Sequence, residues 1–291
     1  MKFVFFGGEP LAVPVLNELK VSGLIPDLIV CNPDRPVGRK QILTPPPAKE
    51  WAEANKIEVF QPTNYKDEAA RTKLSETAWD LFVVVAYNFI LPDWLLELPG
   101  HGTINVHPSL LPKLRGASPI RTAIKDDLRD QIGVSIMLLD QEMDHGPILQ
   151  QMTMPISDDS WPVDGRDLDQ ALAHMGGALL ADTITKWLSG DITPKEQNHE
   201  AATYCHKLSK ADSELNIDPY NLPTEDEARA ALRQIRAFAG IGDTFFKHKD
   251  KRIKVKQASL DDNDTLIIKS VIPEGKKEMS FTDYLNQHGA E

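Results

Sequence analysis

The chain has 291 residues, with 32 lysines and arginines against 43 aspartates and glutamates, which gives a formal net charge of −11. Nucleic acids and anionic membranes are bound chiefly through Lys and Arg, so this balance excludes a polyanion-binding protein unless basic residues gather on a local surface. Hydrophobic residues at 41% and charged residues at 26% are typical of a globular chain and exclude wholesale disorder.

Cysteine usage and the first residues indicate the compartment. Cys31 and Cys205 are the two cysteines, and they lie far apart without metal-ligand spacing. Neither a disulfide framework nor a Cys-based zinc site is therefore expected. The opening apolar run at 3–6 is too short for a signal peptide or a membrane span. These features predict a soluble cytoplasmic protein without a bound metal.

Short apolar runs alternate with amphipathic segments in the first part of the chain. Strands are predicted at 3–6, 27–32, 58–60 and 80–86, and helices at 11–23, 47–56 and 67–77. This alternation predicts an α/β fold with an open, Rossmann-like, mostly parallel sheet. The glycines after the first strand lack the G-x-G-x-x-G spacing, and no acidic residue closes the second strand, so a nicotinamide cofactor is disfavoured.

The later segments change character. Alternating apolar residues at 133–140 and 146–156 predict antiparallel strands beside the sheet, and a long amphipathic helix follows at 167–190. Beyond a polar stretch, a helix at 225–240 and short strands at 244–249, 252–260 and 265–272 predict a small, abridged β-barrel-like module of OB type. We expect a catalytic domain at 1–188, a linker at 189–206 and a second domain at 207–291.

Asn105 and His107 follow an apolar strand and stand two residues apart on a predicted short strand, so their side chains point the same way. Loops at the carboxyl ends of strands form the ligand crevice of open α/β sheets. Asp144 lies in a predicted loop between two strands, where Gly146 and Pro147 fix the turn. We expect these three polar side chains to meet.

An amide, an imidazole and a carboxylate fit acyl transfer to an amine. Asn105 can donate to the oxygen that becomes negative as the nucleophile adds, and a protonated His107 can donate a charge-assisted bond to the same oxygen. Asp144 can hold the protonated imidazole and take a proton from the amine. Taken singly, each residue is more simply a packed histidine, a turn asparagine or a solvated loop charge.

In its sequence contexts, this set resembles the N10-formyltetrahydrofolate-dependent formyltransferase family. The run HPSLLPKLRG at 107–116 is highly specific for that family, and its catalytic asparagine, histidine and aspartate match Asn105, His107 and Asp144. Within the family, the segments NPDRPVGRKQILTPPPAKEWAEANKIEVFQP at 32–62 and TYCHKLSKADSEL at 203–215 resemble members that formylate methionyl-tRNA. The resemblance covers 1–215 and returns more weakly near the carboxyl end.

The resemblance implies transfer of the formyl group of 10-formyltetrahydrofolate, as a co-substrate, to the amino group of initiator methionyl-tRNA, for the initiation of translation. Neither a metal nor a covalent enzyme intermediate is implied. The positions that match the family's folate contacts are Ser109, Leu110, Leu111 and Pro112, with Ala86, Asn88, Ile90 and Leu91 around the pterin.

Basic residues on two segments are the expected tRNA contacts. The segment 32–49 is predicted to be a loop, either a solvated Pro-rich connection or, by the resemblance, the loop that enters the acceptor stem. The second segment, 229–256, holds nine basic and two acidic residues, a local balance of +7 within an acidic chain. The expected contacts in these two segments are Arg35, Arg39, Lys40, Arg233, Arg236, Lys249, Arg252 and Lys254, and Arg115 of the run at 107–116 is expected to join them.

Two alternatives remain open. The first keeps the chemistry and changes the acceptor to an amino sugar nucleotide or another small amine, which requires neither the basic loop nor the basic second module. The second is a non-catalytic tRNA-binding protein, suggested by the abridged second module. We expect a monomer.

Overall fold

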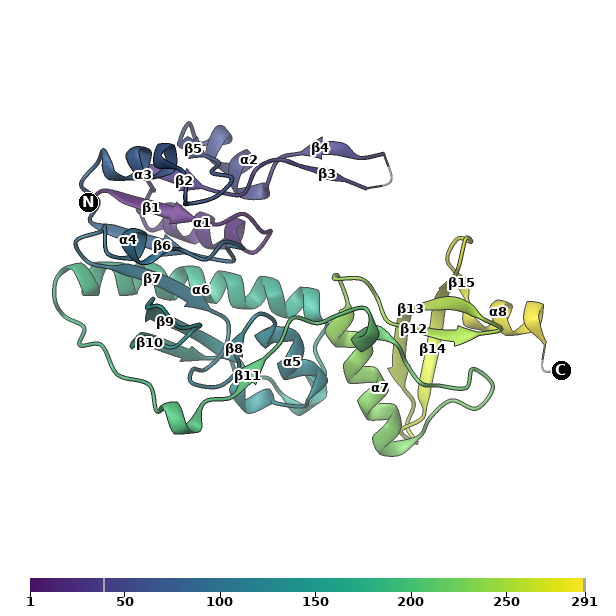
Figure 1. Ribbon diagram of the computed structural model, residues 1–291. Helices are drawn as coiled ribbons and strands as arrows, with labels where there is room; N and C mark the ends of the chain where they lie inside the picture. The colour runs from purple at the N-terminus through teal and green to yellow at the C-terminus, as the bar shows by residue number, and fades with distance from the viewer. Residues whose placement is uncertain (39, 290–291) are drawn as a thin grey trace. The chain divides into compact units, whose positions relative to one another are not determined.

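The computed structural model describes residues 1–38 and 40–289 (Figure 1). The chain divides into two compact units, each assembled from several segments. Unit 1 comprises Met1–Gly116, Ile132–Met154 and Asp169–Tyr204, and unit 2 comprises Ala117–Gln131, Pro155–Leu168 and Cys205–Glu291. The continuous domains expected from the sequence, with limits at 188 and 206, stay a prediction. Among the helices of these described residues, none is long and apolar enough to cross a membrane.

Unit 1 is built on a seven-stranded sheet in the order β10-β9-β7-β6-β1-β2-β5. The five strands from β5 to β7 are parallel, whereas β9 and β10 join antiparallel at the edge. The mostly parallel sheet predicted from the sequence is therefore confirmed. The strands are β1 (Phe3–Phe6), β2 (Leu28–Val30), β5 (Glu58–Phe60), β6 (Leu81–Val84), β7 (Thr103–His107), β9 (Gly133–Leu138) and β10 (Ile148–Thr153).

Helices cover both faces of this sheet because alternate strand residues point to opposite sides. On one face, Val4, Phe6 and Phe82 pack with Leu74 of α3 and Leu95 of α4 in one buried cluster. The long helix α6 runs along the sheet (Figure 1) and approaches β7 closely at Gly176, where a Cβ atom would lie 3.0 Å from Val106. The helices are α1 (Ala12–Val21), α2 (Pro47–Ala54), α3 (Glu68–Ser75), α4 (Asp93–Leu96) and α6 (Gly165–Leu188).

The order of connections creates a switch point in the sheet. The chain leaves β1 toward β2 and β5, and then returns to the opposite side of β1 to form β6 and β7. At such a point, the loops at the carboxyl ends of neighbouring strands diverge, and open α/β sheets bind ligands there. Gly7 after β1, Ala86 after β6 and His107 at the end of β7 all lie at the carboxyl-terminal edge of the parallel strands.

The basic segment after β2 differs from the predicted loop. It forms a two-stranded antiparallel hairpin of β3 (Arg35–Val37) and β4 (Ile42–Thr44). Arg39 lies outside the described residues. Three residue pairs join β3 to β4, so backbone groups that a Pro-rich loop would expose to water face the paired strand instead. Val37, Ile42 and Leu43 are all more than half exposed, so the hairpin carries apolar side chains into solvent.

Unit 2 contains an antiparallel sheet in the order β12-β13-β14-β15. The small β-rich module is confirmed, and its sheet is open, since no pairing joins β12 to β15 within residues 205–289. Its strands are β12 (Phe245–His248), β13 (Lys251–Leu260), β14 (Leu266–Pro273) and β15 (Met279–Ser280), and its helices are α5 (Pro119–Lys125), α7 (Glu225–Phe238) and α8 (Phe281–His288).

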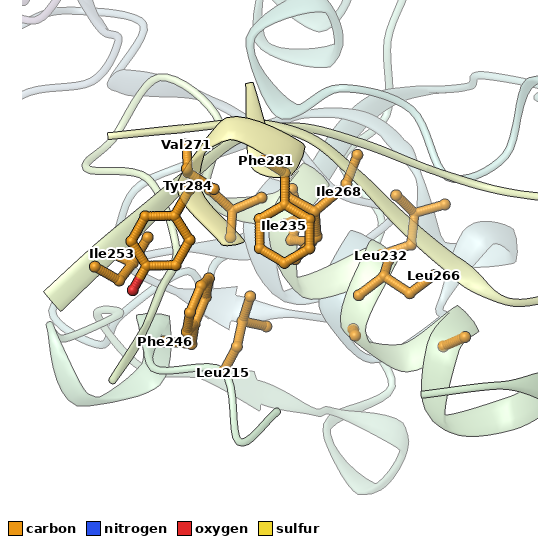
Figure 2. Close-up of a cluster of buried hydrophobic side chains, with 14 residues drawn as sticks. Leu215, Leu232, Ile235, Phe246, Ile253, Leu266, Ile268, Val271, Phe281 and Tyr284 are labelled. Carbon is orange, nitrogen blue, oxygen red and sulfur yellow. The ribbon is translucent and has the colours of Figure 1, made fainter. Parts of the chain in front are cut away.

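The core of this second sheet is closed by helices instead of by further strands. Leu232 and Ile235 of α7 and Phe281 and Tyr284 of α8 point toward Phe246 of β12 and the neighbouring sheet residues (Figure 2). The hydroxyl of Ser280 accepts a hydrogen bond from the Asp283 backbone N–H and so caps α8. Two helices packed on one sheet thus bury the apolar side chains that a closed barrel would place inside.

Candidate active site

Asn105 and His107 lie on β7, next to the switch point of the sheet. Asn105 pairs with Val84 of β6 and His107 pairs with Ser135 of β9. The strand alternation puts both side chains on the same face, as the sequence predicted. His107 is 4% exposed and Asn105 is half-buried. Within residues 1–38 and 40–289, the Asn105 side chain makes no hydrogen bond, so its amide is available to a bound molecule.

His107 faces two hydrogen-bond acceptors. Its Nε2 lies 2.9 Å from the Leu114 carbonyl oxygen, and its Nδ1 lies 3.4 Å from Oδ1 of Asp144. A carbonyl oxygen only accepts, so Nε2 donates its proton to Leu114, whereas the longer Nδ1–Oδ1 distance makes the Asp144 carboxylate an ion-pair partner of the imidazole when the imidazole is protonated. The geometry brings His107 and Asp144 together as predicted, and it also reveals a contact with Leu114 that the sequence did not suggest.

The Asp144 carboxylate is fixed by a backbone N–H and by the close packing of its own turn. Its Oδ2 accepts a 2.7 Å hydrogen bond from the Gly116 backbone N–H, and its side chain is 12% exposed. Two residues later, the chain passes so close to β9 that a Cβ on Gly146 would lie 2.1 Å from the Leu138 carbonyl oxygen. The turn that presents Asp144 therefore requires glycine at 146.

Three residues around this site have strained backbone conformations. Ala86, Leu114 and Asp144 have φ angles of 46°, 58° and 52°, in the left-handed region that residues other than glycine rarely adopt. Such residues cost on the order of 1–3 kcal/mol each and persist where the surroundings determine them, which occurs often at functional sites. One strained residue lies in each of three loops at this edge of the sheet.

Ser135 of β9 fixes the loop after β7 through hydrogen bonds. The Ser135 hydroxyl donates to the Ser109 carbonyl at 2.6 Å and accepts from the Leu111 N–H at 3.0 Å. Gln151 of β10 donates to the same hydroxyl and to the Leu111 carbonyl. Ser109 and Leu111 are buried, Leu110 and Pro112 are half-buried, and the Leu111–Pro112 peptide bond is cis. Sequence reasoning missed Ser135, although a serine inside the apolar strand GVSIML was a usable signal.

The expected pterin residues diverge in exposure. Leu91 is 7% exposed and Ala86 is half-buried, whereas Ile90 is 90% exposed and Asn88 is also exposed. The Asn88 amide donates to the Glu9 carboxylate, which ties the loop after β6 to the loop after β1. In the described part of the chain, no His, Cys, Asp or Glu side chains form a group of three that could hold a metal ion.

With this geometry established, the comparisons with known proteins identify the family. The model of the formyl transferase family matches residues 1–184. The chain belongs to this family. A methionyl-tRNA formyltransferase of Halalkalibacterium halodurans is 43% identical over 216 residues, which cover 74% of this chain and 67% of that protein. One from Listeria innocua is 33% identical over 311 residues, which cover 99% of this chain and 96% of that protein.

Solved structures share the fold of this formyl transferase. An N-formyltransferase from Helicobacter canadensis, in complex with folinic acid and dTDP-3-aminofucose, aligns with a TM-score of 0.61 at 17% identity, over 96% of this chain and 100% of that chain. A methionyl-tRNA formyltransferase from Clostridium thermocellum aligns with a TM-score of 0.58 at 16% identity, over 94% and 98%.

The basic residues predicted to contact tRNA differ in their exposure to solvent. Arg35 is exposed on β3, and Lys40 is exposed in the turn between β3 and β4. Arg115, expected on a tRNA-facing surface, is instead 2% exposed, because its guanidinium donates hydrogen bonds to Gln197 and reaches His199 and Tyr204 inside unit 1. The burial of Arg115 corrects the expectation from the sequence.

In unit 2, the cations of segment 229–256 are largely paired with carboxylates. The partners come from other parts of unit 2 as well as from the segment, so the +7 count overstates the free positive charge. Arg233 pairs with Asp127, Arg236 with Asp164, Arg229 with Asp226 and Asp264, Lys247 with Glu214, Arg252 with Glu274, and Lys254 and Lys256 with Asp243. Lys249 is exposed, and its ammonium donates to the His288 carbonyl.

Proposed function

We propose that this protein transfers the formyl group of 10-formyltetrahydrofolate to the α-amino group of initiator methionyl-tRNA. The observation that carries the proposal is the Asn105 amide, which makes no hydrogen bond within the described residues and stands on the same face of β7 as His107, the partner of Asp144. Similarity over 99% of the chain to a methionyl-tRNA formyltransferase supports the choice of acceptor. The initiation of translation takes place in the cytoplasm, and we propose that location and a monomeric state for the protein.

The reaction needs a donor for a developing negative oxygen. The amine nitrogen attacks the formyl carbon, a C–N bond forms, and the carbonyl oxygen becomes an oxyanion. The bond from that carbon to N10 of the folate then breaks, N10 takes a proton, and the amine loses one. We assign Asn105 as the donor that meets the oxyanion, because its amide makes no hydrogen bond within the described residues and so needs no partner to be displaced.

His107 and Asp144 carry the proton chemistry in this proposal. His107 Nε2 exchanges the Leu114 carbonyl oxygen for the oxyanion, and this exchange is favourable because a hydrogen bond to a charged acceptor is stronger than one to a neutral carbonyl. Asp144 orients the imidazole through Nδ1 and accepts the proton of the attacking amine, directly or through one water molecule.

The folate is assigned to the loops at the same edge of the sheet. Ser109 to Pro112 contact it on one side, and Ala86, Asn88, Ile90 and Leu91 surround the pterin ring on the other. The exposed side chain of Ile90 suits this role, since an apolar residue 90% exposed to solvent gains free energy when a planar ring covers it.

The tRNA contacts are assigned to the β3–β4 hairpin and to unit 2. Arg35 and Lys40 approach the acceptor stem from the hairpin, together with Arg39. Arg233, Arg236, Lys249, Arg252 and Lys254 of unit 2 contact phosphates. The exposed ion pairs of Arg252 and Lys254 contribute about 0–1 kcal/mol each, so these two cations can exchange a carboxylate for a phosphate at little cost.

A side-by-side assay of acceptors tests the proposal. The purified protein and 10-formyltetrahydrofolate are incubated with initiator methionyl-tRNA or with a dTDP-linked amino sugar, and formylated product is measured by mass spectrometry. We expect formyl-methionyl-tRNA and no formylated sugar. Formylation of the sugar alone would establish the small-amine alternative, and tRNA binding without either product would establish the non-catalytic one.

A further inference from the structure

Gln197 lies in the polar stretch 189–206, yet its side chain is 5% exposed and both of its polar atoms are used twice. Its Nε2 donates to the Asp144 carbonyl at 2.9 Å and to the Gly146 carbonyl at 2.7 Å. Its Oε1 accepts from Nε and Nη2 of Arg115 at 3.1 and 2.7 Å. The side chain therefore bridges a buried arginine and the turn that carries Asp144.

The orientation of this amide follows from the chemistry of its partners. Carbonyl oxygens only accept hydrogen bonds and a guanidinium only donates them, so the nitrogen of Gln197 must face the turn and the oxygen must face Arg115. The reversed amide would place an oxygen against two carbonyl oxygens and a nitrogen against two N–H groups. One orientation of the amide satisfies all four contacts.

Arg115 explains why Gln197 stays in place. Its guanidinium is 2% exposed and forms no ion pair within residues 1–38 and 40–289, so its charge is satisfied by hydrogen bonds to groups other than carboxylates. Besides Gln197, these groups are Nδ1 of His199 at 2.9 Å and the Tyr204 hydroxyl at 3.3 Å. A buried charge without hydrogen bonds is costly, and loss of Gln197 would remove two of them. The arginine therefore fixes the glutamine from behind.

We propose that Gln197 is a positioning residue that holds the turn of Asp144, an inference that rests on the catalytic role proposed for Asp144. The turn is strained at Asp144, whose φ is 52°, and Gln197 binds the carbonyls on both sides of His145. With the backbone of the turn held, Oδ2 stays on the Gly116 N–H and Oδ1 stays beside His107. We call these two hydrogen bonds from Gln197 to the turn the Gln197 clamp. Loss of the clamp lets the strained turn relax and moves the Asp144 carboxylate away from the His107 imidazole.

Gln197→Glu is the sharpest substitution, because it keeps an acceptor for Arg115 and replaces the donor toward the turn with an oxygen. A displacement of about 1 Å in a catalytic group costs on the order of 100-fold, so kcat should fall by about that factor. The KM values for tRNA and for 10-formyltetrahydrofolate should stay within about twofold, since neither ligand contacts Gln197 in the proposal. Gln197→Met, which has similar length and no amide, should act in the same direction.

Gln234→Glu is the matched control. Gln234 of α7 likewise donates through Nε2 to two backbone carbonyls, those of Asp212 and Glu214, but it lies in unit 2. Its substitution makes the same chemical change and should leave kcat unchanged. An equal loss of kcat in both variants would mean general destabilisation and would overturn the inference.

Two measurements separate this inference from the proposed function. A crystal structure of Gln197→Glu should show the Asp144 carboxylate displaced from the Gly116 N–H, and an unmoved turn would overturn the clamp whatever the activity. In the Asp144→Asn background, Gln197→Glu should lower single-turnover formylation no further, because it acts through Asp144. A full additional loss there would also overturn the clamp, whereas normal turnover of Asp144→Asn itself would overturn the catalytic assignment of Asp144.

Discussion

Removal of the Ser135 hydroxyl should both destabilise unit 1 and weaken folate binding. The side chain is fully buried and its one oxygen makes three hydrogen bonds, to Ser109, Leu111 and Gln151. Ser135→Ala leaves the Ser109 carbonyl and the Leu111 N–H buried without partners. The space of one oxygen atom is too small to admit a water molecule in its place.

The magnitude follows from the two orphaned backbone groups. Each buried polar group without a partner costs about 1–3 kcal/mol, so the free energy of unfolding should fall by about 2–6 kcal/mol. Gln151 keeps its bond to the Leu111 carbonyl, so the loop should be loosened and not lost. A looser loop at 109–112 should raise the KM for 10-formyltetrahydrofolate about tenfold and leave the KM for tRNA unchanged.

Urea denaturation followed by circular dichroism gives the first quantity, and initial-rate kinetics give the second. Ser189→Ala is the control, because this hydroxyl is also hydrogen-bonded but lies on an exposed residue at the end of α6. Its effect should stay within about 0.5 kcal/mol. If Ser135→Ala matches the control in unfolding free energy and in folate KM, the argument for this loop is refuted.

Three further predictions concern other parts of the chain. Asp243→Asn releases Lys254 and Lys256 from their ion pairs and should tighten tRNA binding at low salt, measured by filter binding across a salt series. Asp182→Asn makes the same charge change in unit 1 and should tighten binding less. Equal effects of the two substitutions would contradict the assignment of tRNA contacts to unit 2. Burial raises the pKa of the Cys31 thiol to about 12, so at pH 8 only on the order of 10⁻⁴ of the thiol is ionised. Iodoacetamide should therefore modify Cys31 only after the protein is unfolded. Rapid labelling of Cys31 in the native protein would contradict its burial. Burial and the neighbouring cations lower the pKa of His248 below its ordinary value of 6.5, so the unfolded state binds more protons as pH falls, and the unfolding free energy should drop below pH 6.5. The drop should be smaller in His248→Gln, and identical pH profiles would argue against a lowered pKa.

The fold of unit 1 followed from local sequence patterns because its strands and helices each carry their own signal. Continuous apolar runs at 3–6 and 80–86 and the amphipathic segment at 167–190 match β1, β6 and α6 closely. The hairpin of β3 and β4 was missed, since proline and glycine at 36 and 38 are typical of loops and its side chains bury little apolar surface.

The part of the candidate site that lies on one strand could be predicted, because residue spacing along a strand decides which side chains share a face. Asn105 and His107 share a face of β7 because they stand two residues apart, and that follows from the sequence alone. The burial of Arg115 could not be read in this way, because its partners stand more than 80 residues away along the chain. The same holds for Arg233 and Arg236, whose carboxylate partners come from distant segments of unit 2.

The central claim is that formyl transfer takes place at Asn105, His107 and Asp144, and single-turnover kinetics test it most directly. Enzyme in excess is mixed with initiator methionyl-tRNA and saturating 10-formyltetrahydrofolate, and formyl-methionyl-tRNA is followed with time for wild type and for Asp144→Asn. We expect a rate constant lowered by about 10²–10⁴ in the variant, with an unchanged circular dichroism spectrum. A rate constant within threefold of wild type would contradict it.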